Sequence, residues 1–194
     1  IDRRGTKANF NSNSRPYEVS ASLCIAGNRL FAAWRTTEKD LLNNSGETPN
    51  ALFKTGGCLD LMLQTSTDQR LLVTVVKGQP RAVLYRSKVP GTTQPVAFSS
   101  PWRTISIDVV EDITSQVTFA TDKTGNYEIS VPLATLHWTP KTSDIVRADI
   151  GVLRGSNGQT TQRVYWSNKA TAITADVPSE AELTPKLWGQ WKVQ

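Results

Sequence analysis

The chain has 194 residues, of which 38% are hydrophobic and 20% charged, and it carries a formal net charge of +5 at pH 7. This balance suits a soluble globular domain with a sizeable core, and no apolar run approaches the roughly 20 residues that span a bilayer. The basic excess is spread along the chain and is not interleaved with aromatics, which argues against a nucleic-acid-binding surface.

Short runs rich in Val, Thr, Ile and aromatic residues alternate with polar turns, which predicts an all-β chain. Residues 1–16 are polar and are expected to form an arm ahead of a single domain over residues 17–194. The expected strands are 17–26, 29–36, 57–64, 69–77, 81–87, 102–111, 116–121, 127–131, 146–153 and 161–167. About ten such strands are typical of an antiparallel β-sandwich or a flattened barrel.

The segments between these strands have their own signals. Gly27 and Asn28 accept positive φ and predict a hairpin turn. Residues 88–101 contain three prolines and are expected to be a loop, and one helical turn is expected at 37–43 and another at 133–136. Near the end of the chain, Ser179 is expected to cap a short acidic helix over residues 179–183.

The strand over residues 57–64 has the clearest alternation and is expected at the centre of the fold. Its three leucines share one face and require a core, whereas Cys58, Asp60, Met62 and Gln64 share the other face. We therefore expect the function to be displayed on or near this second face.

The sequence offers little for catalysis or metal binding. The sole histidine, His137, has no G-x-S-x-G partner motif, and the carboxylates are scattered, so we expect no enzyme. Cys24 and Cys58 fall in predicted strands and form either one disulfide or two buried free thiols. No cysteine and histidine cluster is present to predict zinc.

The six tryptophans are more informative, because aromatic faces stack on sugar rings while polar side chains bond the hydroxyl groups. Most of them are expected to be core or loop anchors. Trp166 is the best exception, because it stands at a strand end beside Asn168.

Three stretches carry a family resemblance: RLFAAWRT at 29–36, GCLDLML at 57–63, and RVYWSN followed by PKLWGQWKV near the end. In this order they resemble the family 9 carbohydrate-binding modules and the related DOMON-like β-sandwich domains, over residues 17–193. The likeness is strongest to modules of large planctomycete-type bacterial proteins. It implies a non-catalytic module that binds a sugar or the end of a polysaccharide, within an exported protein that is extracellular or periplasmic.

In that family two aromatic side chains sandwich a sugar, and an acidic residue and an arginine bind its hydroxyls. By position, Asp60 is similar to the acidic residue, and Arg81, with Arg86 as an alternative, lies on the strand that supplies the arginine. The early aromatic has its nearest equivalent in Phe53. The resemblance thus implies these carbohydrate-binding residues: Phe53, Asp60, Arg81, Arg154, Trp166 and Asn168.

Two alternatives stay open. Some DOMON-like domains are b-type cytochromes, and Met62 with His137 would then be the axial haem ligands. A purely structural or protein-interaction module is the other alternative. Some family members bind calcium, but no Asp-rich loop supports calcium here. We expect a monomer whose partners are a carbohydrate and the remainder of a larger chain, with no nucleic acid or membrane. The start at Ile1, without a Met or a signal-like apolar segment, indicates a chain that was processed or excised from something longer.

Overall fold

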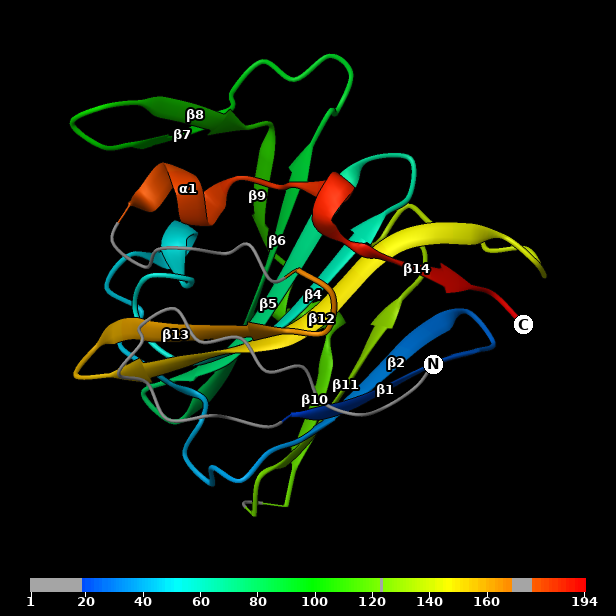
Figure 1. The fold of residues 1–194 in the computed structure, drawn as a ribbon, viewed down its shortest axis with the longest axis horizontal. Coiled ribbons are helices and arrows are strands. Elements are labelled where there is room, and N and C mark those ends of the chain that lie inside the picture. The colour runs from blue at the N-terminus through cyan, green and yellow to red at the C-terminus, as the bar shows by residue number, and fades with distance from the viewer. Residues whose placement is uncertain (1–18, 123, 169–175) are drawn as a thin grey trace.

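The structure is a computed structural model that describes residues 19–122, 124–168 and 176–194. The described chain forms an antiparallel β-sandwich, as predicted, in which two sheets enclose an apolar core (Figure 1). The arm expected at residues 1–16 and the start of the first expected strand lie outside the described residues. Within the described ranges, no helix is long and apolar enough to cross a membrane.

The smaller sheet has four strands in the order β1-β2-β11-β10. Their bounds are Ser20–Ala26 for β1, Arg29–Arg35 for β2, Asn126–Pro132 for β11 and Thr118–Thr121 for β10. The predicted hairpin between β1 and β2 is confirmed, and Gly27 has a φ of +55° at its turn. Alternation then directs Leu30, Ala32 and Trp34 of β2 into the core.

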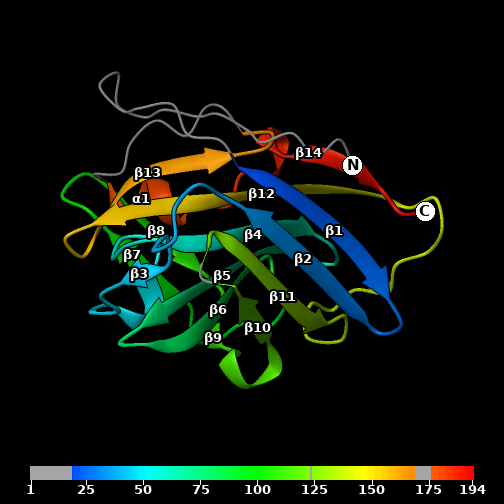
Figure 2. The ribbon, with the colours of Figure 1, turned by 90° about the horizontal axis from the view of Figure 1, so that it is seen from below.

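The larger sheet has the order β13-β12-β4-β5-β6-β9, with β14 added on β12 and β3 added in parallel on β5. The bounds are Gln159–Tyr165 (β13), Ile145–Ser156 (β12), Cys58–Gln64 (β4), Asp68–Val76 (β5), Gln79–Ser87 (β6), Val109–Asp112 (β9), Gly189–Lys192 (β14) and Asn43–Asn44 (β3). The strand β4 lies inside this sheet, as predicted. Figure 2 shows the smaller sheet as a layer packed across β12, β4 and β5.

A second apolar cluster lies on the other face of the larger sheet. It is covered by the hairpin of β7 (Val96–Ser99) and β8 (Thr104–Ile107), by the helix α1 (Val177–Ala181), and by the 3-10 turn Pro49–Ala51. Two further 3-10 turns are Thr114–Gln116 and Pro185–Leu187. Both faces of β4 are therefore buried. The sequence alone suggests that the face with Asp60 is displayed to a ligand, but in the structure this face does not meet solvent.

Several predicted boundaries are wrong for identifiable reasons. The expected loop 88–101 contains β7, because Phe98 packs into the second cluster. The expected strand 102–111 is divided into β8 and β9 in different sheets. The break falls at Asp108, whose carboxylate accepts a hydrogen bond from the Val89 N–H at 2.9 Å.

The end of the chain also differs from prediction. Asp176, not Ser179, caps α1, and the Ser179 N–H donates to the Asp176 side chain. Pro178 fits here because the first turn of a helix needs no backbone donor. The strand 161–167 is not the last one, because β14 pairs with the start of β12.

The two cysteines are free. Cys24 is exposed on β1 and Cys58 is buried on β4, in different sheets. The prediction of a disulfide is therefore wrong, and so is the alternative prediction that both free thiols are buried.

Candidate functional site

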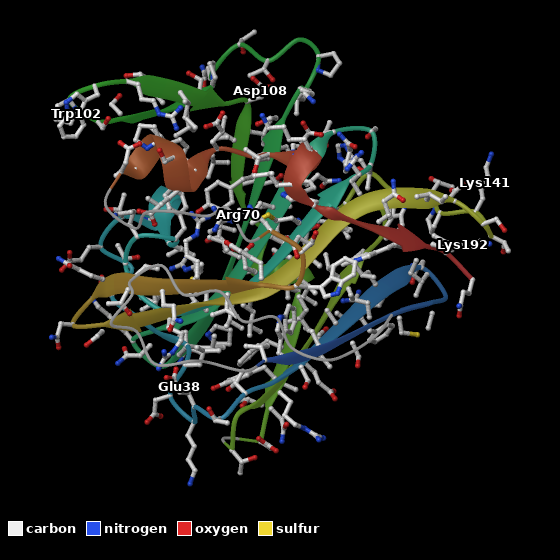
Figure 3. All side chains as sticks on the ribbon, in the orientation of Figure 1. Glu38, Arg70, Trp102, Asp108, Lys141 and Lys192 are labelled. Atoms are coloured by element: carbon white, nitrogen blue, oxygen red, sulfur yellow. The ribbon has the colours of Figure 1, made fainter. Side chains whose placement is uncertain are left out.

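The polar centre of the fold is the buried ion pair between Asp60 of β4 and Arg70 of β5. The Arg70 Nη2 atom lies 2.7 Å from Asp60 Oδ2, and Nε lies 3.1 Å from both carboxylate oxygens. The side chains are 0% and 1% exposed, respectively. Figure 3 shows Arg70 near the centre of the molecule.

This pair belongs to a larger network that ties α1 to the sheet. The Tyr165 hydroxyl donates to Asp60 at 2.6 Å, and Arg70 Nη1 donates to the Glu180 carbonyl oxygen at 2.6 Å. The Glu180 side chain forms an ion pair with Lys54 at 2.8 Å. Burial raises the pKa of Glu180 and is only partly opposed by Lys54. The centre is thus a structural anchor beneath α1, with no surface open to a ligand at Asp60.

The structure brings Phe53 to this same centre. The Arg70 guanidinium lies 5.3 Å from the Phe53 ring centroid, and Phe53 also packs against Tyr85 and Phe98. Phe53 is fully buried, so its ring has no free face for stacking on a sugar.

Sequence analysis missed Arg70, although a signal for it was present. The β4–β5 hairpin aligns Met62 with Arg70 and Asp60 with Leu72. Cross-strand neighbours share a face, so Arg70 lies diagonally opposite Asp60 once this register is known. The register itself depends on where the turn at 65–67 closes.

The remaining predicted sugar contacts do not converge on Asp60. Arg81 on β6 pairs with Asp112 at 2.5 Å. Arg154 on β12 donates to Glu38 at 2.8 Å. In the sheet, β4 and β5 separate the strands of these two arginines. The alternative, Arg86, pairs with Glu111 at 2.8 Å.

Trp166 and Asn168 lie at the end of β13, in a tightly packed segment. The Asn168 N–H donates to Asp149 Oδ2 at 2.7 Å, and the Ser167 N–H donates to Asp149 Oδ1 at 2.9 Å. Trp166 is half-buried, with its ring centroid 6.5 Å from that of Trp191. A Cβ atom on Gly189 would lie 2.2 Å from the Trp166 ring, so this glycine allows the close approach.

The two residues considered as haem ligands lie on opposite faces of the larger sheet. Met62 packs in the second cluster, on the same face as Asp60. His137 is exposed, and its neighbours Leu136 and Trp138 belong to the core between the sheets. The structure therefore does not bring Met62 and His137 together around one cofactor. Among the described residues, no group of three or more His, Cys, Asp or Glu could hold a metal ion.

One side chain open to a ligand is Trp102, at the tip of the β7–β8 hairpin. It is 86% exposed, the most exposed large hydrophobic side chain of the described residues, whereas the other five tryptophans are buried or half-buried. Figure 3 shows Trp102 at the far end of the hairpin, directed away from the sheets. Ser100 defines the tip, because its Oγ accepts from the Arg103 N–H at 3.3 Å and from the Trp102 N–H at 3.4 Å.

Arg103, the residue that follows Trp102, anchors the hairpin to polar side chains of α1 and its two ends. Arg103 Nη2 donates to Ser179 Oγ and to Glu182 Oε2, both at 3.0 Å, and Nε lies 3.6 Å from Asp176 Oδ2. The hydrogen bond from Ser179 is the main cause that lowers the pKa of Asp176. We call the set of Trp102, Arg103, Asp176, Ser179 and Glu182 the hairpin edge. It combines one free aromatic face with donors and acceptors held by a defined geometry.

A second open surface lies on the outer face of the smaller sheet. A hollow of about 830 Å³ has a floor of small residues that includes Ser22 and Ala33, and it is flanked by Arg35 and Glu128. Phe31, 41% exposed, lies on the same face of β2. Trp34 also lines this hollow, but it is only 2% exposed and offers no free ring face, so the hairpin edge is the better candidate for stacking.

The comparison with solved structures agrees with the fold. A protein from Bacteroides uniformis ATCC 8492, provisionally assigned as carbohydrate-binding, matches with a TM-score of 0.60 and 9% identity, over 99% of this chain and 85% of that one. A family 9 carbohydrate-binding module from Caldicellulosiruptor kristjanssonii, in complex with glucose, matches with a TM-score of 0.53 and 10% identity, over 98% and 84%. Its complex with cellotriose gives a TM-score of 0.53 and 10% identity, over 100% and 83%.

No family profile and no curated protein sequence matches the chain. The chain therefore has the fold of the family 9 modules, at an identity too low for more than the fold to be taken from the likeness.

Proposed function

We propose that this chain is a non-catalytic carbohydrate-binding module that binds sugar rings at the hairpin edge. Trp102 would stack on the apolar face of a pyranose ring, and the polar side chains anchored to α1 would bond its hydroxyl groups. The proposal includes export to the cell exterior or periplasm and a place within a larger protein. The fold likeness to modules crystallised with glucose and cellotriose supports the ligand class.

The observation that carries the proposal is the 86% exposed indole of Trp102 on an anchored hairpin. A rigid aromatic platform beside fixed polar groups suits a sugar, because the ring gives apolar contact and the polar groups give orientation. The ion pairs of Arg103 with Asp176 and Glu182 hold the platform in place before any ligand arrives. Preorganisation of this kind reduces the ordering cost of binding.

The test is a calorimetric titration of the full chain with glucose, cellotriose and a wider panel of oligosaccharides. We expect Trp102→Ala to weaken association by about fivefold, since a stacked aromatic contributes on the order of 1 kcal/mol. Trp102→Phe should retain part of the affinity. The midpoint of thermal unfolding should not change, because the ring is exposed.

Phe31→Ala is the matched control, because it removes an exposed aromatic side chain from the outer face of the smaller sheet. It should leave sugar affinity within about twofold, a difference below 0.5 kcal/mol. No response to any glycan, or equal losses in Trp102→Ala and Phe31→Ala, would contradict the proposal.

A further inference from the structure

Next to the hairpin edge, two adjoining hollows form a groove on the outer side of the larger sheet. Their volumes are about 440 Å³ and 430 Å³, and both are lined by Gln64, Lys88 and Arg147. The 3-10 turn Pro185–Leu187 contributes Lys186 to the second hollow, and Glu182 contributes to its rim. Glu182 also accepts a hydrogen bond from Arg103, so the groove and the hairpin edge share this residue.

The backbone explains why these residues meet. Arg147 lies two residues before Asp149 on β12, so the two side chains share the outer face of the sheet. The register of β12 with β4 places Ala148 opposite Leu63, so Arg147 comes beside Gln64 at the end of β4.

The groove carries unpaired positive charge, because its acidic side chains already have partners. Asp68 accepts from Gln64 at 2.8 Å through one oxygen and pairs with Lys88 at 2.6 Å through the other. Glu182 is paired with Arg103 at 3.0 Å. The nearby Asp149 is satisfied by backbone N–H groups at 2.7–2.9 Å. Both acidic residues of the groove are therefore already paired.

Two cations remain. Arg147 is half-buried and Lys186 is exposed, and neither side chain has a hydrogen bond or ion pair to any residue that the structure describes. A partly buried guanidinium without a partner has donors free for an anion, and its planar fork matches a carboxylate or sulfate group in two-point contact.

We propose that this groove binds the carboxylate or sulfate group of an acidic glycan, with Arg147 as the main contact and Lys186 as a second cation. The inference rests on the proposed function and narrows its ligand from sugars in general to polysaccharides that carry negative charge. A glycan long enough to extend from Trp102 past Glu182 would place its acidic group over Arg147.

The experiment titrates the full chain with three probes: oligogalacturonate, which carries carboxylates; sulfated cello-oligosaccharide; and neutral cello-oligosaccharide. We expect Arg147→Gln to weaken association with an acidic probe by about tenfold, the effect of losing one charge-assisted contact. Binding of the neutral probe should stay within about twofold. Lys186→Gln, at an exposed position, should show a smaller loss of the same kind. Preference for one acidic probe identifies carboxylate or sulfate as the group.

The matched control is Lys77→Gln, which removes the same charge at the β5–β6 turn, outside the groove. Equal losses in Lys77→Gln and Arg147→Gln would show only general attraction of polyanions and would overturn the inference. So would unchanged acidic binding in Arg147→Gln. If Trp102→Ala changes nothing while Arg147→Gln still weakens acidic binding, the proposed function fails and the anion groove stands.

Discussion

The burial of Asp60 leads to a sharp prediction about stability. Replacing Asp60 by Asn keeps the shape of the side chain and removes its charge, which leaves the Arg70 guanidinium without a counter-charge at 1% exposure. Burial lowers the pKa of Arg70, but the Asp60 carboxylate together with Tyr165 and Tyr85 raises it by more, so the net shift is upward and the guanidinium stays charged. Breaking one partner of a buried pair costs about 3–5 kcal/mol.

We therefore expect Asp60→Asn to lower the unfolding free energy by about 3–5 kcal/mol. This loss includes the weakening of the 2.6 Å hydrogen bond from Tyr165. The double variant Asp60→Leu with Arg70→Met should recover most of the loss, because apolar side chains of similar volume replace buried ion pairs well. Urea unfolding followed by circular dichroism measures both variants. Domains are stable by roughly 5–15 kcal/mol, so the single variant should be clearly weakened.

The same variants test whether Asp60 contacts a ligand. If the ion pair serves only the fold, the double variant should bind glycans like the wild type. A stable Asp60→Asn protein, within about 1 kcal/mol of wild type, that loses glycan binding would refute the structural reasoning. It would then support the sequence-based assignment of Asp60 to the sugar site.

The remaining predictions concern pH and thiol chemistry. Burial raises the pKa of Asp149 from 3.8 to about 6, so its contribution to stability is present below pH 3.8 and is lost as the pH rises through 6. We expect the unfolding free energy to fall by roughly 3 kcal/mol between pH 4 and pH 7 because of Asp149. Denaturant unfolding at several pH values measures this, and an equal fall of the unfolding free energy with pH in Asp149→Asn and wild type would contradict this origin. Cys24 is exposed, whereas Cys58 is buried and its pKa is raised to about 12 by burial. A thiol reagent at pH 8 should therefore label one cysteine of the folded chain, and rapid labelling of Cys24→Ser would argue against the burial of Cys58.

Local patterns predicted much of the fold because alternation depends on neighbouring residues alone. The leucine face of β4 packs into the core between the sheets, and β5 is buried on both faces along most of its length, as its apolar run indicates. The β1–β2 hairpin follows from Gly27 and Asn28 at its turn. These features need no knowledge of distant segments.

The candidate site was less predictable, because exposure depends on segments far apart in the chain. Alternation places Asp60 on the face opposite the leucines, but it does not say that α1 and the β7–β8 hairpin cover that face. Trp102 was assigned to a strand, and its place at a hairpin tip depends on the break at Asp108. The pairing of Arg70 with Asp60 needed the register of the β4–β5 hairpin.

The sequence by itself therefore determined the class of fold and which side chains share a face, since both follow from a two-residue period. Only the tertiary structure decided which face meets solvent. Long-range packing buries the Asp60 face beneath the β7–β8 hairpin and α1, while it leaves Trp102 and Arg147 at the surface. The sites proposed for ligands are thus those that packing left open.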